Sequence, residues 1–274
     1  MSFALKPVQP PEKTIGNFRY TLLTDEWVES YAECHAMVWT SSNAISATVG
    51  ITYEQYLPYA RILGKHAAEE RLSLVCIDIE RQKVIAFAVS DDLKAKPLTG
   101  LETLDPKFEI HWHFTNQIED PFRGSHAALP YGTMIHGNVG GVLPEEQYRS
   151  HGILNNLAKY SIPYFWALGY TLHFGVCTHP ATQHMCRKMG SEKMAELFFK
   201  DFEYNGTRPL ESIKSPASAI LYLSRVKRIY ALQHEHEDSD EDHPRTSLDH
   251  ICDTPIPDLE HTRDVNEERW ILGE

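Results

Sequence analysis

The sequence predicts a single α/β domain followed by an acidic tail. Of its 274 residues, 42% are hydrophobic and 23% are charged, which are ordinary proportions for a globular protein with a buried core. Strand and helix patterns alternate along residues 17–230. The net charge of -12 is concentrated in residues 231–274, where 14 acidic residues stand against 3 basic ones, so the body is nearly neutral.

This distribution of charge argues against a nucleic-acid partner, because binding to phosphate backbones needs clustered Lys and Arg. Residues 1–13 lack the cationic and apolar regions of a secretory signal, and no apolar run reaches the ~20 residues of a membrane helix. We therefore expect a soluble, cytoplasmic protein without a membrane anchor. Five cysteines without a C-x-x-C pair favour reduced thiols over a disulfide framework or a zinc ribbon.

The first part of the chain predicts an extended arm, one strand and two helices. Three prolines favour an extended arm over residues 1–16. Residues 18–23 are predicted to form a strand, and Thr24 followed by two acids predicts a helix that runs to about residue 38. Apolar residues at helical spacing predict a second helix over residues 52–64, ending at Gly64.

Two strands, residues 72–79 and 84–90, are predicted to form a hairpin around a polar turn. Residues 91–132 contain four prolines and read as irregular, except that residues 108–114 (FEIHWHF) alternate as a strand does. A connection of this length is typical of loops that shape a substrate pocket. The remaining predicted elements are strands over residues 133–142, 171–177, 194–204 and 219–226, and helices over residues 146–168, with a kink or break at Pro163, and 180–189.

The acidic tail, residues 231–274, contains too few large apolar side chains to offset the entropy of ordering it. We expect it to be disordered. The predicted organisation is therefore an arm over residues 1–16, a folded domain over residues 17–230 and a tail over residues 231–274.

The segment GNVGGVLPEEQYRSHGIL, residues 137–154, places the end of a strand, a loop and a helix start in succession. A helix that begins at Arg149 directs unpaired backbone N–H groups and the positive end of its dipole toward one point, which favours phosphate. Gly152 permits close backbone approach, and Arg149 and Ser150 add side-chain donors. Any helix start offers such donors, so a purely structural role is the alternative.

This segment resembles the coenzyme A motif of the GNAT superfamily of N-acetyltransferases, in which V-x-P precedes Q/R-x-x-G-x-G/A at the start of a long helix. Here Val142-Leu143-Pro144 precedes Arg149-Ser150-His151-Gly152-Ile153-Leu154. The resemblance covers about residues 17–230 and implies a mixed, mainly antiparallel sheet flanked by helices. It also implies acetyl-coenzyme A as co-substrate. Its pyrophosphate would lie on Arg149, Ser150, His151, Gly152, Ile153 and Leu154, and its pantetheine beside Gly141, Val142 and Leu143.

Two features depart from the family motif: Leu154 stands in place of a small residue, and the loop between Pro144 and Arg149 is about two residues longer. A second family segment, N-x-x-A-x-x-L-Y-x-x-x-G-F, aligns with the helix before Gly190. Cys186 stands where many members have the Tyr that protonates the leaving thiolate, so it is either that proton donor or a buried structural thiol. His179 stands where the family has Asn, and either lies beside pantetheine or caps the helix.

The acceptor amine must lose a proton before it attacks the thioester, and histidine is suited to accept it near neutral pH. His136 lies six residues before Val142, where some GNAT members carry a catalytic Glu. Strand alternation places His136 and Asn138 on one face, and Gly140 and Gly141 permit a bulge. His136 is therefore either the general base or a hydrogen-bonded structural residue.

The long connection contains further candidates. His111 and His113 share one face of the strand predicted at residues 108–114, but no third ligand lies nearby, so we expect no metal site. The aromatic residues of this region either pack in the core or form a lid over a small acceptor. They are Trp112, Phe114, Phe122 and Tyr131.

Together these features predict a GNAT-type N-acetyltransferase. It would transfer an acetyl or short acyl group from acyl-coenzyme A to a primary amine by direct attack in a ternary complex. A connection that closes over a small acceptor favours a small-molecule amine, as does a distant likeness to arylalkylamine N-acetyltransferases. The alternatives are a non-enzymatic acyl-coenzyme A sensor and an interaction protein that uses its acidic tail.

Overall fold

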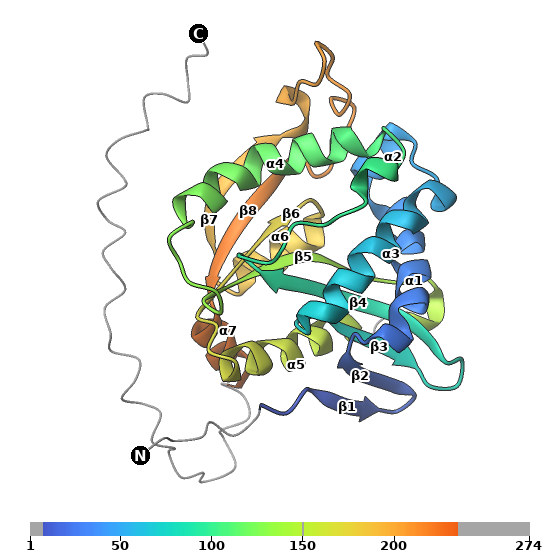
Figure 1. Ribbon diagram of the computed structural model, residues 1–274, viewed down its shortest axis with the longest axis vertical. Helices are drawn as coiled ribbons and strands as arrows, with labels where there is room; N and C mark the ends of the chain where they lie inside the picture. The colour runs from blue at the N-terminus through green and yellow to red at the C-terminus, as the bar shows by residue number, and fades with distance from the viewer. Residues whose placement is uncertain (1–7, 150, 235–274) are drawn as a thin grey trace. The chain divides into compact units, whose positions relative to one another are not determined.

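An eight-stranded sheet forms the centre of this computed structural model, which describes residues 8–149 and 151–234. The strand order is β1-β2-β3-β4-β5-β6-β8-β7, and only the β5–β6 pair is parallel (Figure 1). This confirms the mixed, mainly antiparallel sheet. The strands are β1 Glu12–Ile15, β2 Phe18–Leu22, β3 Leu74–Asp78, β4 Lys83–Asp92, β5 Met134–Val142, β6 Leu172–Cys177, β7 Glu192–Phe198 and β8 Ser218–Arg225.

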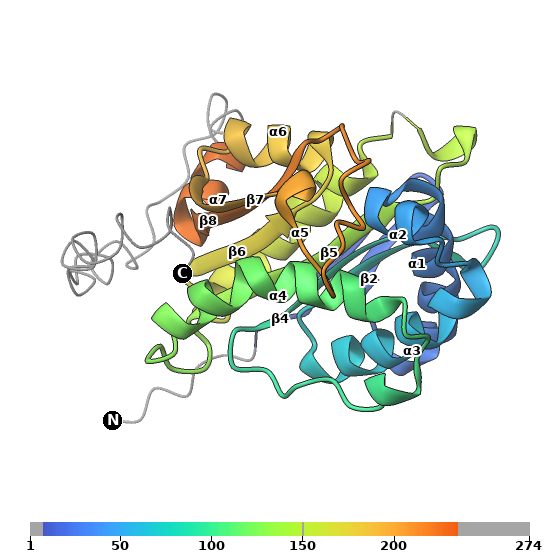
Figure 2. The same cartoon turned by 90° about the horizontal axis from the view of Figure 1, so that it is seen from above.

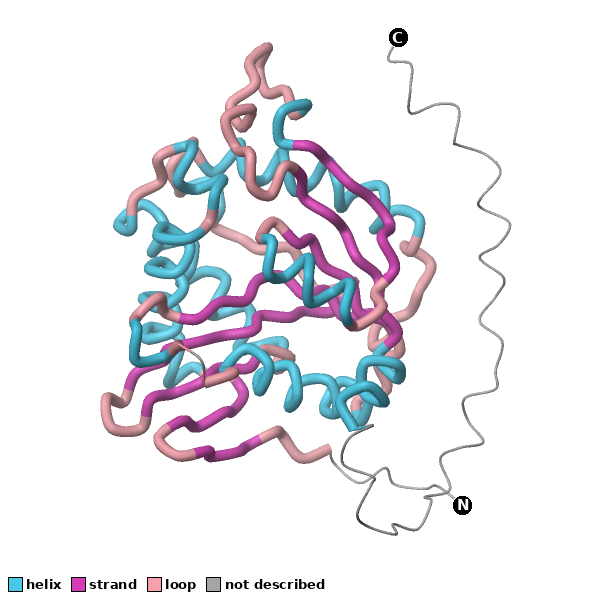
Figure 3. Tube along the Cα trace, turned by 180° about the vertical axis from the view of Figure 1, so that it is seen from behind, coloured by secondary structure: helices cyan, strands magenta, loops and turns pink. Residues whose placement is uncertain are grey.

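Helices cover both faces of the sheet. Helices α1, α3 and α4 lie on one face, and α5 and α6 lie on the other (Figures 2 and 3). The helices are α1 Val28–Ser42, α2 Ala44–Val49, α3 Tyr53–Glu70, α4 Phe108–Ser125, α5 Ile153–Ala167, α6 Pro180–Lys188 and α7 Val226–His234. Short 3-10 turns are η1 Asp25–Trp27, η2 Leu101–Thr103, η3 Glu146–Tyr148 and η4 Phe199–Asp201.

The sequence predicted that this helix ends at Gly64. Helix α3 instead continues to Glu70. A Cβ at position 64 would lie 2.7 Å from the ring of Tyr31, so this glycine allows α1 and α3 to pack closely. Arg71, with a φ of 56°, takes the left-handed conformation at the end of the helix. The glycine therefore serves helix packing, and a sequence pattern alone does not separate that role from helix termination.

The strand predicted at residues 108–114 is wrong, because these residues begin helix α4. Phe114, Ile118 and Phe122 recur every four residues and are buried together, which is the repeat of a helix. This repeat extends beyond the seven residues 108–114, in which the alternation suggested a strand. His111 and His113 consequently do not share a face. The ring of His111 lines a cavity described below, whereas His113 is exposed and packs against Tyr204.

The helix predicted over residues 146–168 is divided. Residues Glu146–Tyr148 form a 3-10 turn, and α5 begins at Ile153 rather than at Arg149. Helix α5 then continues through Pro163, where a kink or break was expected. Three elements lie outside the predicted set, namely β1, α2 and α7, and α7 extends past residue 230. Most of the predicted disordered tail, residues 235–274, lies outside the described residues.

Strands β5 and β6 pair over only three residues before they diverge. The register is Met134↔Leu172, Ile135↔His173 and His136↔Phe174, after which β5 continues to Val142 without a partner on this side. A Cβ at Gly175 would lie 2.7 Å from the carbonyl oxygen of Gly137, so the backbones are in close contact where pairing stops. The glycines thus set the point at which the sheet opens.

Gly175→Ala is expected to lower the free energy of unfolding by about 1–3 kcal/mol, because the added methyl meets backbone and cannot be accommodated by a side-chain rotation. Thermal unfolding measures the effect as a lower melting temperature. Gly140→Ala is the matched control, since a Cβ there meets the Phe87 carbonyl oxygen at an ordinary 3.5 Å. Equal melting temperatures for the two variants would contradict the close approach of β5 and β6.

Candidate active site

Two cavities meet where β5 and β6 diverge. The larger, of about 660 Å³, lies among β5, α5, β6 and α6, and we call it the large cavity. The second, of about 570 Å³, is lined by residues of α1, α3, α4 and β4, and we call it the α4 cavity. Five residues line both cavities: Trp39, Asn138, Val139, Val176 and Thr178. The two cavities therefore adjoin at these residues.

The start of α5 supplies backbone donors beside the large cavity. Gly152 precedes the helix with a φ of 63°, a left-handed conformation that favours glycine. The first hydrogen bond at this end runs from the Asn156 N–H to the Gly152 carbonyl oxygen at 2.9 Å. The backbone N–H groups of the first turn of α5, before Asn156, therefore have no acceptor within the helix, as at any helix start.

The ten residues predicted to bind coenzyme A are spread over several environments. Four of them line the large cavity: Gly141, Val142, Leu154 and His179. Leu143 and Ile153 are buried in the core, Arg149, His151 and Gly152 are exposed, and Ser150 lies outside the described residues. Leu154 is half-buried against the core and lines the cavity wall, where the family motif has a small residue.

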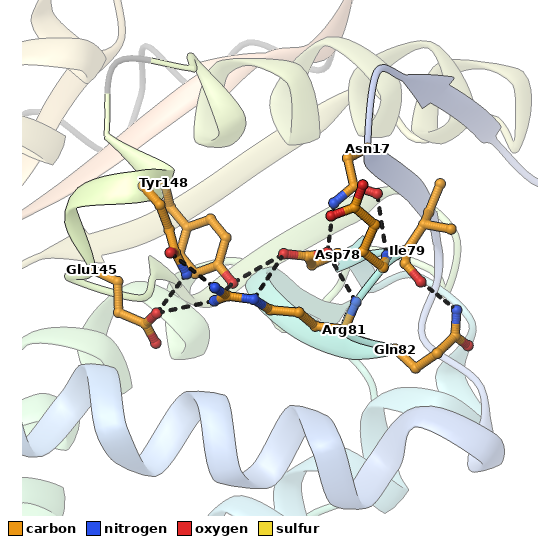
Figure 4. Close-up of polar contacts among 9 residues, drawn as sticks. Asn17, Asp78, Ile79, Arg81, Gln82, Glu145 and Tyr148 are labelled. Carbon is orange, nitrogen blue, oxygen red and sulfur yellow. Dashed lines mark hydrogen bonds and ion pairs between the residues drawn. The ribbon is translucent and has the colours of Figure 1, made fainter.

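The long loop between β5 and α5 is anchored by Tyr148, which is 4% exposed. Its hydroxyl donates to Asp78 Oδ2 at 3.2 Å and accepts from Arg81 Nη1 at 3.0 Å (Figure 4). Arg81 also contacts Glu145 at 3.4 Å, so the turn between β3 and β4 is tied to the loop. Residues 145–148 of this loop are thus held against the turn between β3 and β4.

Arg149 contributes little free positive charge to this region. Its Nη1 lies 2.8 Å from Glu146 Oε2, and 64% of its side chain is exposed. Exposed pairs of this kind are worth less than about 1 kcal/mol, so an anion is able to displace the carboxylate.

The end of β6 and helix α6 bring two thiols and an imidazole to the large cavity. Cys186 Sγ lies 3.5 Å from Cys177 Sγ. The contact with Cys177 lowers the pKa of Cys186 and raises that of Cys177, because one sulfur donates to the other. His179 Nδ1 accepts from the Ala181 N–H at 3.2 Å and so caps α6, while the residue also lines the cavity. Both roles considered for His179 are therefore compatible with its position.

His136 lies in the α4 cavity between two carboxylates. Its Nδ1 is 2.9 Å from Asp91 Oδ1, and its Nε2 is 3.5 Å from Glu119 Oε1. Arg123 completes the cluster, with Nη2 at 2.8 Å from His136 Nδ1 and Nε at 3.1 Å from Glu119 Oε2. We call these four residues the His136 cluster. Asn138 also approaches Asp91, at 3.4 Å, so His136 and Asn138 share a face. The strand irregularity lies between Val89 and Ser90, opposite Asn138, rather than at the two glycines.

The carboxylates hold His136 in its charged form. Burial by itself lowers the pKa of His136, but the negative charges of Asp91 and Glu119 overcome burial and raise it to about 9. Burial raises the pKa of Glu119, and the charges of His136 and Arg123 more than reverse this and lower it to about 2. The pKa of Asp91 is lowered in the same way. The raised pKa favours an imidazolium at neutral pH, with a carboxylate at each nitrogen. The contact of Arg123 with Nδ1 is a hydrogen bond only when the ring is neutral, because Arg123 can only donate.

Aromatic side chains form the opposite wall of the α4 cavity. Tyr56, Tyr59 and Trp112 lie on α3 and α4, and Tyr56 donates or accepts a hydrogen bond at 3.2 Å from His35 Nε2. Of the aromatic residues considered as a lid, Trp112 alone lines this cavity. Phe114 and Phe122 are buried in the core, and Tyr131 is 62% exposed, with its hydroxyl on Glu70.

Sequence reasoning missed several residues of this site. Asp91 and Glu119 lie 45 and 17 positions from His136 in the chain, and no local pattern connects them. The signal that could have found Glu119 and Arg123 is their i,i+4 spacing, once residues 108–125 are read as a helix.

Among residues 8–149 and 151–234, no group of three or more His, Cys, Asp or Glu side chains is arranged to hold a metal ion. No helix in the same part of the chain is long and apolar enough to cross a membrane.

No protein-family model matches the chain, and no curated protein matches its sequence. Solved structures match its fold. The C-terminal condensation domain of Ebony, in complex with beta-alanyl-dopamine, gives a TM-score of 0.68 at 15% identity over 76% of this chain and 98% of that one. For arylalkylamine N-acetyltransferase 2 from Aedes aegypti the TM-score is 0.61 at 11% identity, over 77% and 100% of the two chains. For the Drosophila melanogaster polyamine N-acetyltransferase, which forms N-acetylagmatine, it is 0.55 at 12% identity, over 75% and 99%.

These likenesses show that the chain has the fold of the GNAT N-acetyltransferases. The resemblance found in residues 137–154 is therefore confirmed at the level of fold.

The His136 cluster predicts how stability depends on pH. Because the folded state raises the pKa of His136 from 6.5 to about 9, its stabilising effect is complete below pH 6.5 and is lost as pH rises through about 9. The free energy of unfolding of the wild type is expected to exceed that of His136→Gln at the low end of this range. This difference should shrink across the range by on the order of 2 kcal/mol. Chemical denaturation at several pH values measures it.

His173 provides the control, because it lies beside His136 on β6 and carries no charge in this pH range. Burial and the charge of His136 lower the pKa of His173 to about 4. The difference in the free energy of unfolding between the wild type and His173→Gln should therefore stay constant between pH 6.5 and pH 9.5. A constant difference for His136→Gln as well would show that Asp91 and Glu119 do not hold His136 as a cation against burial and the positive charge of Arg123.

Proposed function

We propose that this protein transfers an acetyl or other short acyl group from acyl-coenzyme A to the primary amine of a small molecule. The observation that carries the proposal is the meeting of two cavities at the divergence of β5 and β6. A thioester in the large cavity and an amine in the α4 cavity would meet there. This arrangement supports direct attack within a ternary complex, in which the two molecules would occupy separate cavities.

The donor would occupy the large cavity. The unpaired N–H groups at the start of α5 suit the pyrophosphate, and Arg149 adds a cation after Glu146 is displaced. The β5 backbone from Gly141 to Leu143 would pair with the amides of pantetheine, because β6 has already diverged from it. Leu154 lies on the cavity wall and narrows it near the helix start.

The acceptor would occupy the α4 cavity, where aromatic rings face the His136 cluster. Carboxylates favour the protonated form of an amine, and the rings of Tyr56, Tyr59 and Trp112 favour an apolar or aromatic body attached to it. Neighbours in fold are named for small amines, such as agmatine and the arylalkylamines. A small-molecule acceptor is therefore preferred to a protein side chain.

His136 is proposed as the general base, and its surroundings suit both protonation states. The charged ring donates to Asp91 and Glu119, whereas the neutral ring, with its proton on Nε2, accepts from Arg123 at Nδ1. An ammonium group that enters beside the carboxylates would repel the imidazolium and lower the pKa of His136. Cys186, whose thiol lines the large cavity, is proposed to donate a proton to the leaving thiolate.

Acetyl-coenzyme A is expected to raise the melting temperature of the full chain, by an amount that corresponds to about 2.7 kcal/mol at a hundredfold excess over Kd. Gly152→Asp should abolish the shift, because it places a negative charge beside the phosphate position. Gly206→Asp is the matched control, since Gly206 has a φ of 73° against 63° for Gly152, and neither would bring a Cβ within 4 Å of other atoms. No shift for the wild type at millimolar ligand would refute the proposed donor.

Turnover separates an enzyme from a non-enzymatic acyl-coenzyme A sensor. Release of free coenzyme A is measured with acetyl-coenzyme A and a panel of small primary amines, among them aromatic and polyamine acceptors. Activity is expected to rise with pH through an apparent pKa near 9 in kcat/KM, because the base must lose its proton. The apparent pKa in kcat should be lower, because the bound amine disfavours the imidazolium.

His136→Gln is expected to lower kcat by about 10²–10⁴ while leaving the acetyl-coenzyme A melting shift intact. Asp91→Asn should move the acid limb of the profile to lower pH, because it removes a charge that raises the pKa of His136. A folded His136→Gln enzyme with wild-type kcat would exclude His136 as the base. Binding of acetyl-coenzyme A without turnover on any amine would favour the sensor.

A further inference from the structure

Cys177 and Cys186 form a thiol pair at one end of the large cavity. Cys177 is the last residue of β6, and Cys186 lies in α6, which packs against that strand (Figure 1). Their Sγ atoms are 3.5 Å apart, and both residues are half-buried and line the cavity. A disulfide requires about 2.05 Å between the sulfur atoms, so the two sulfur atoms must approach each other from their present contact.

The other cysteines of the described residues differ in every one of these respects. Cys34 and Cys76 are completely buried in the core and line neither cavity. Burial raises the pKa of Cys76 to about 12, so this thiol stays protonated. They serve as internal references for a thiol without access to solvent or oxidant.

We propose that Cys177 and Cys186 are a reversible oxidation site, at which a hydroperoxide converts the two thiols to a disulfide. Cys186 is the thiol that reacts first, because the neighbouring Cys177 thiol, Ser191 and Arg187 stabilise its thiolate. The thiolate attacks one peroxide oxygen, the O–O bond breaks, and Cys186 becomes a sulfenic acid with release of water or alcohol.

Cys177 then resolves the sulfenic acid. While Cys186 is a thiolate its charge keeps Cys177 protonated, and conversion to the neutral sulfenic acid removes that charge. The Cys177 sulfur attacks the Cys186 sulfur, a new S–S bond forms, and the hydroxyl leaves as water with the Cys177 proton. Overall, two thiols are oxidised and one hydroperoxide is reduced to water and an alcohol, or to two waters for hydrogen peroxide.

The disulfide would leave Cys177 and Cys186 without a free thiol at this end of the large cavity. It ties the end of β6 to α6 and removes the Cys186 proton that the proposed reaction uses. The oxidation itself does not rest on the proposed function, whereas its effect on turnover does. The two claims therefore fail separately.

The test uses the reduced full chain, treated with hydrogen peroxide at neutral pH, then denatured, alkylated and digested with trypsin. Both cysteines fall on one tryptic peptide, residues 160–187, because no Lys or Arg lies between Lys159 and Arg187. After treatment, the mass of this peptide is expected to be lower by two hydrogen atoms. The amount of its alkylated form should be at least tenfold lower than in the untreated sample. Dithiothreitol should reverse both changes, and Cys34 and Cys76 should remain fully alkylated.

Single variants assign the order of reaction. In Cys177→Ala, Cys186 should accumulate as a sulfenic acid that dimedone traps, and in Cys186→Ala, Cys177 should remain reduced at the same peroxide concentration. Full alkylation of both thiols after treatment of the wild type would overturn the proposal. So would a disulfide through Cys252, or oxidation of Cys177 in Cys186→Ala at the wild-type rate.

Turnover of the oxidised and reduced chain is then compared. Oxidation is expected to lower the rate of coenzyme A release at least tenfold, and reduction to restore it. A complete disulfide with an unchanged rate would remove Cys186 from the proposed chemistry, while the peptide data would still establish the oxidation site.

Discussion

The separation of β5 from β6 is the constraint on which the site depends. Parallel pairing ends after His136↔Phe174, and the close contact between Gly175 and the Gly137 carbonyl marks where the strands diverge. A side chain at either glycine would force the strands apart earlier or move the opening. Because the backbone groups of β5 beyond this point lack a strand partner on that side, they are available to a ligand.

The core is arranged around the same division. One hydrophobic cluster joins β2, β3 and β4 to α1, α3 and α5, and a second joins α4 to β6, β8 and the turn η4. Apolar burial therefore stabilises the two halves of the sheet mainly through different sets of side chains.

The His136 cluster is the second constraint, since it links the two halves through charge. Asp91 comes from β4, His136 from β5, and Glu119 and Arg123 from α4. Buried charges of one sign would be costly, but here two carboxylates face an imidazolium and a guanidinium, and every member has a partner. The cluster ties α4 to the two central strands, β4 and β5.

The sequence by itself determined the alternation of elements, the concentration of acidic charge after residue 230, and the strand, loop and helix order around Gly152. These depend on local periods and on residues such as glycine and proline, which act within a few positions. The apolar repeat of Phe114, Ile118 and Phe122 that makes residues 108–125 a helix is likewise local. Only the tertiary structure decided that Tyr148 anchors the long loop and that Asp91 and Glu119 enclose His136. The physical reason is that these features arise from packing between distant segments, so no local pattern in the chain specifies them.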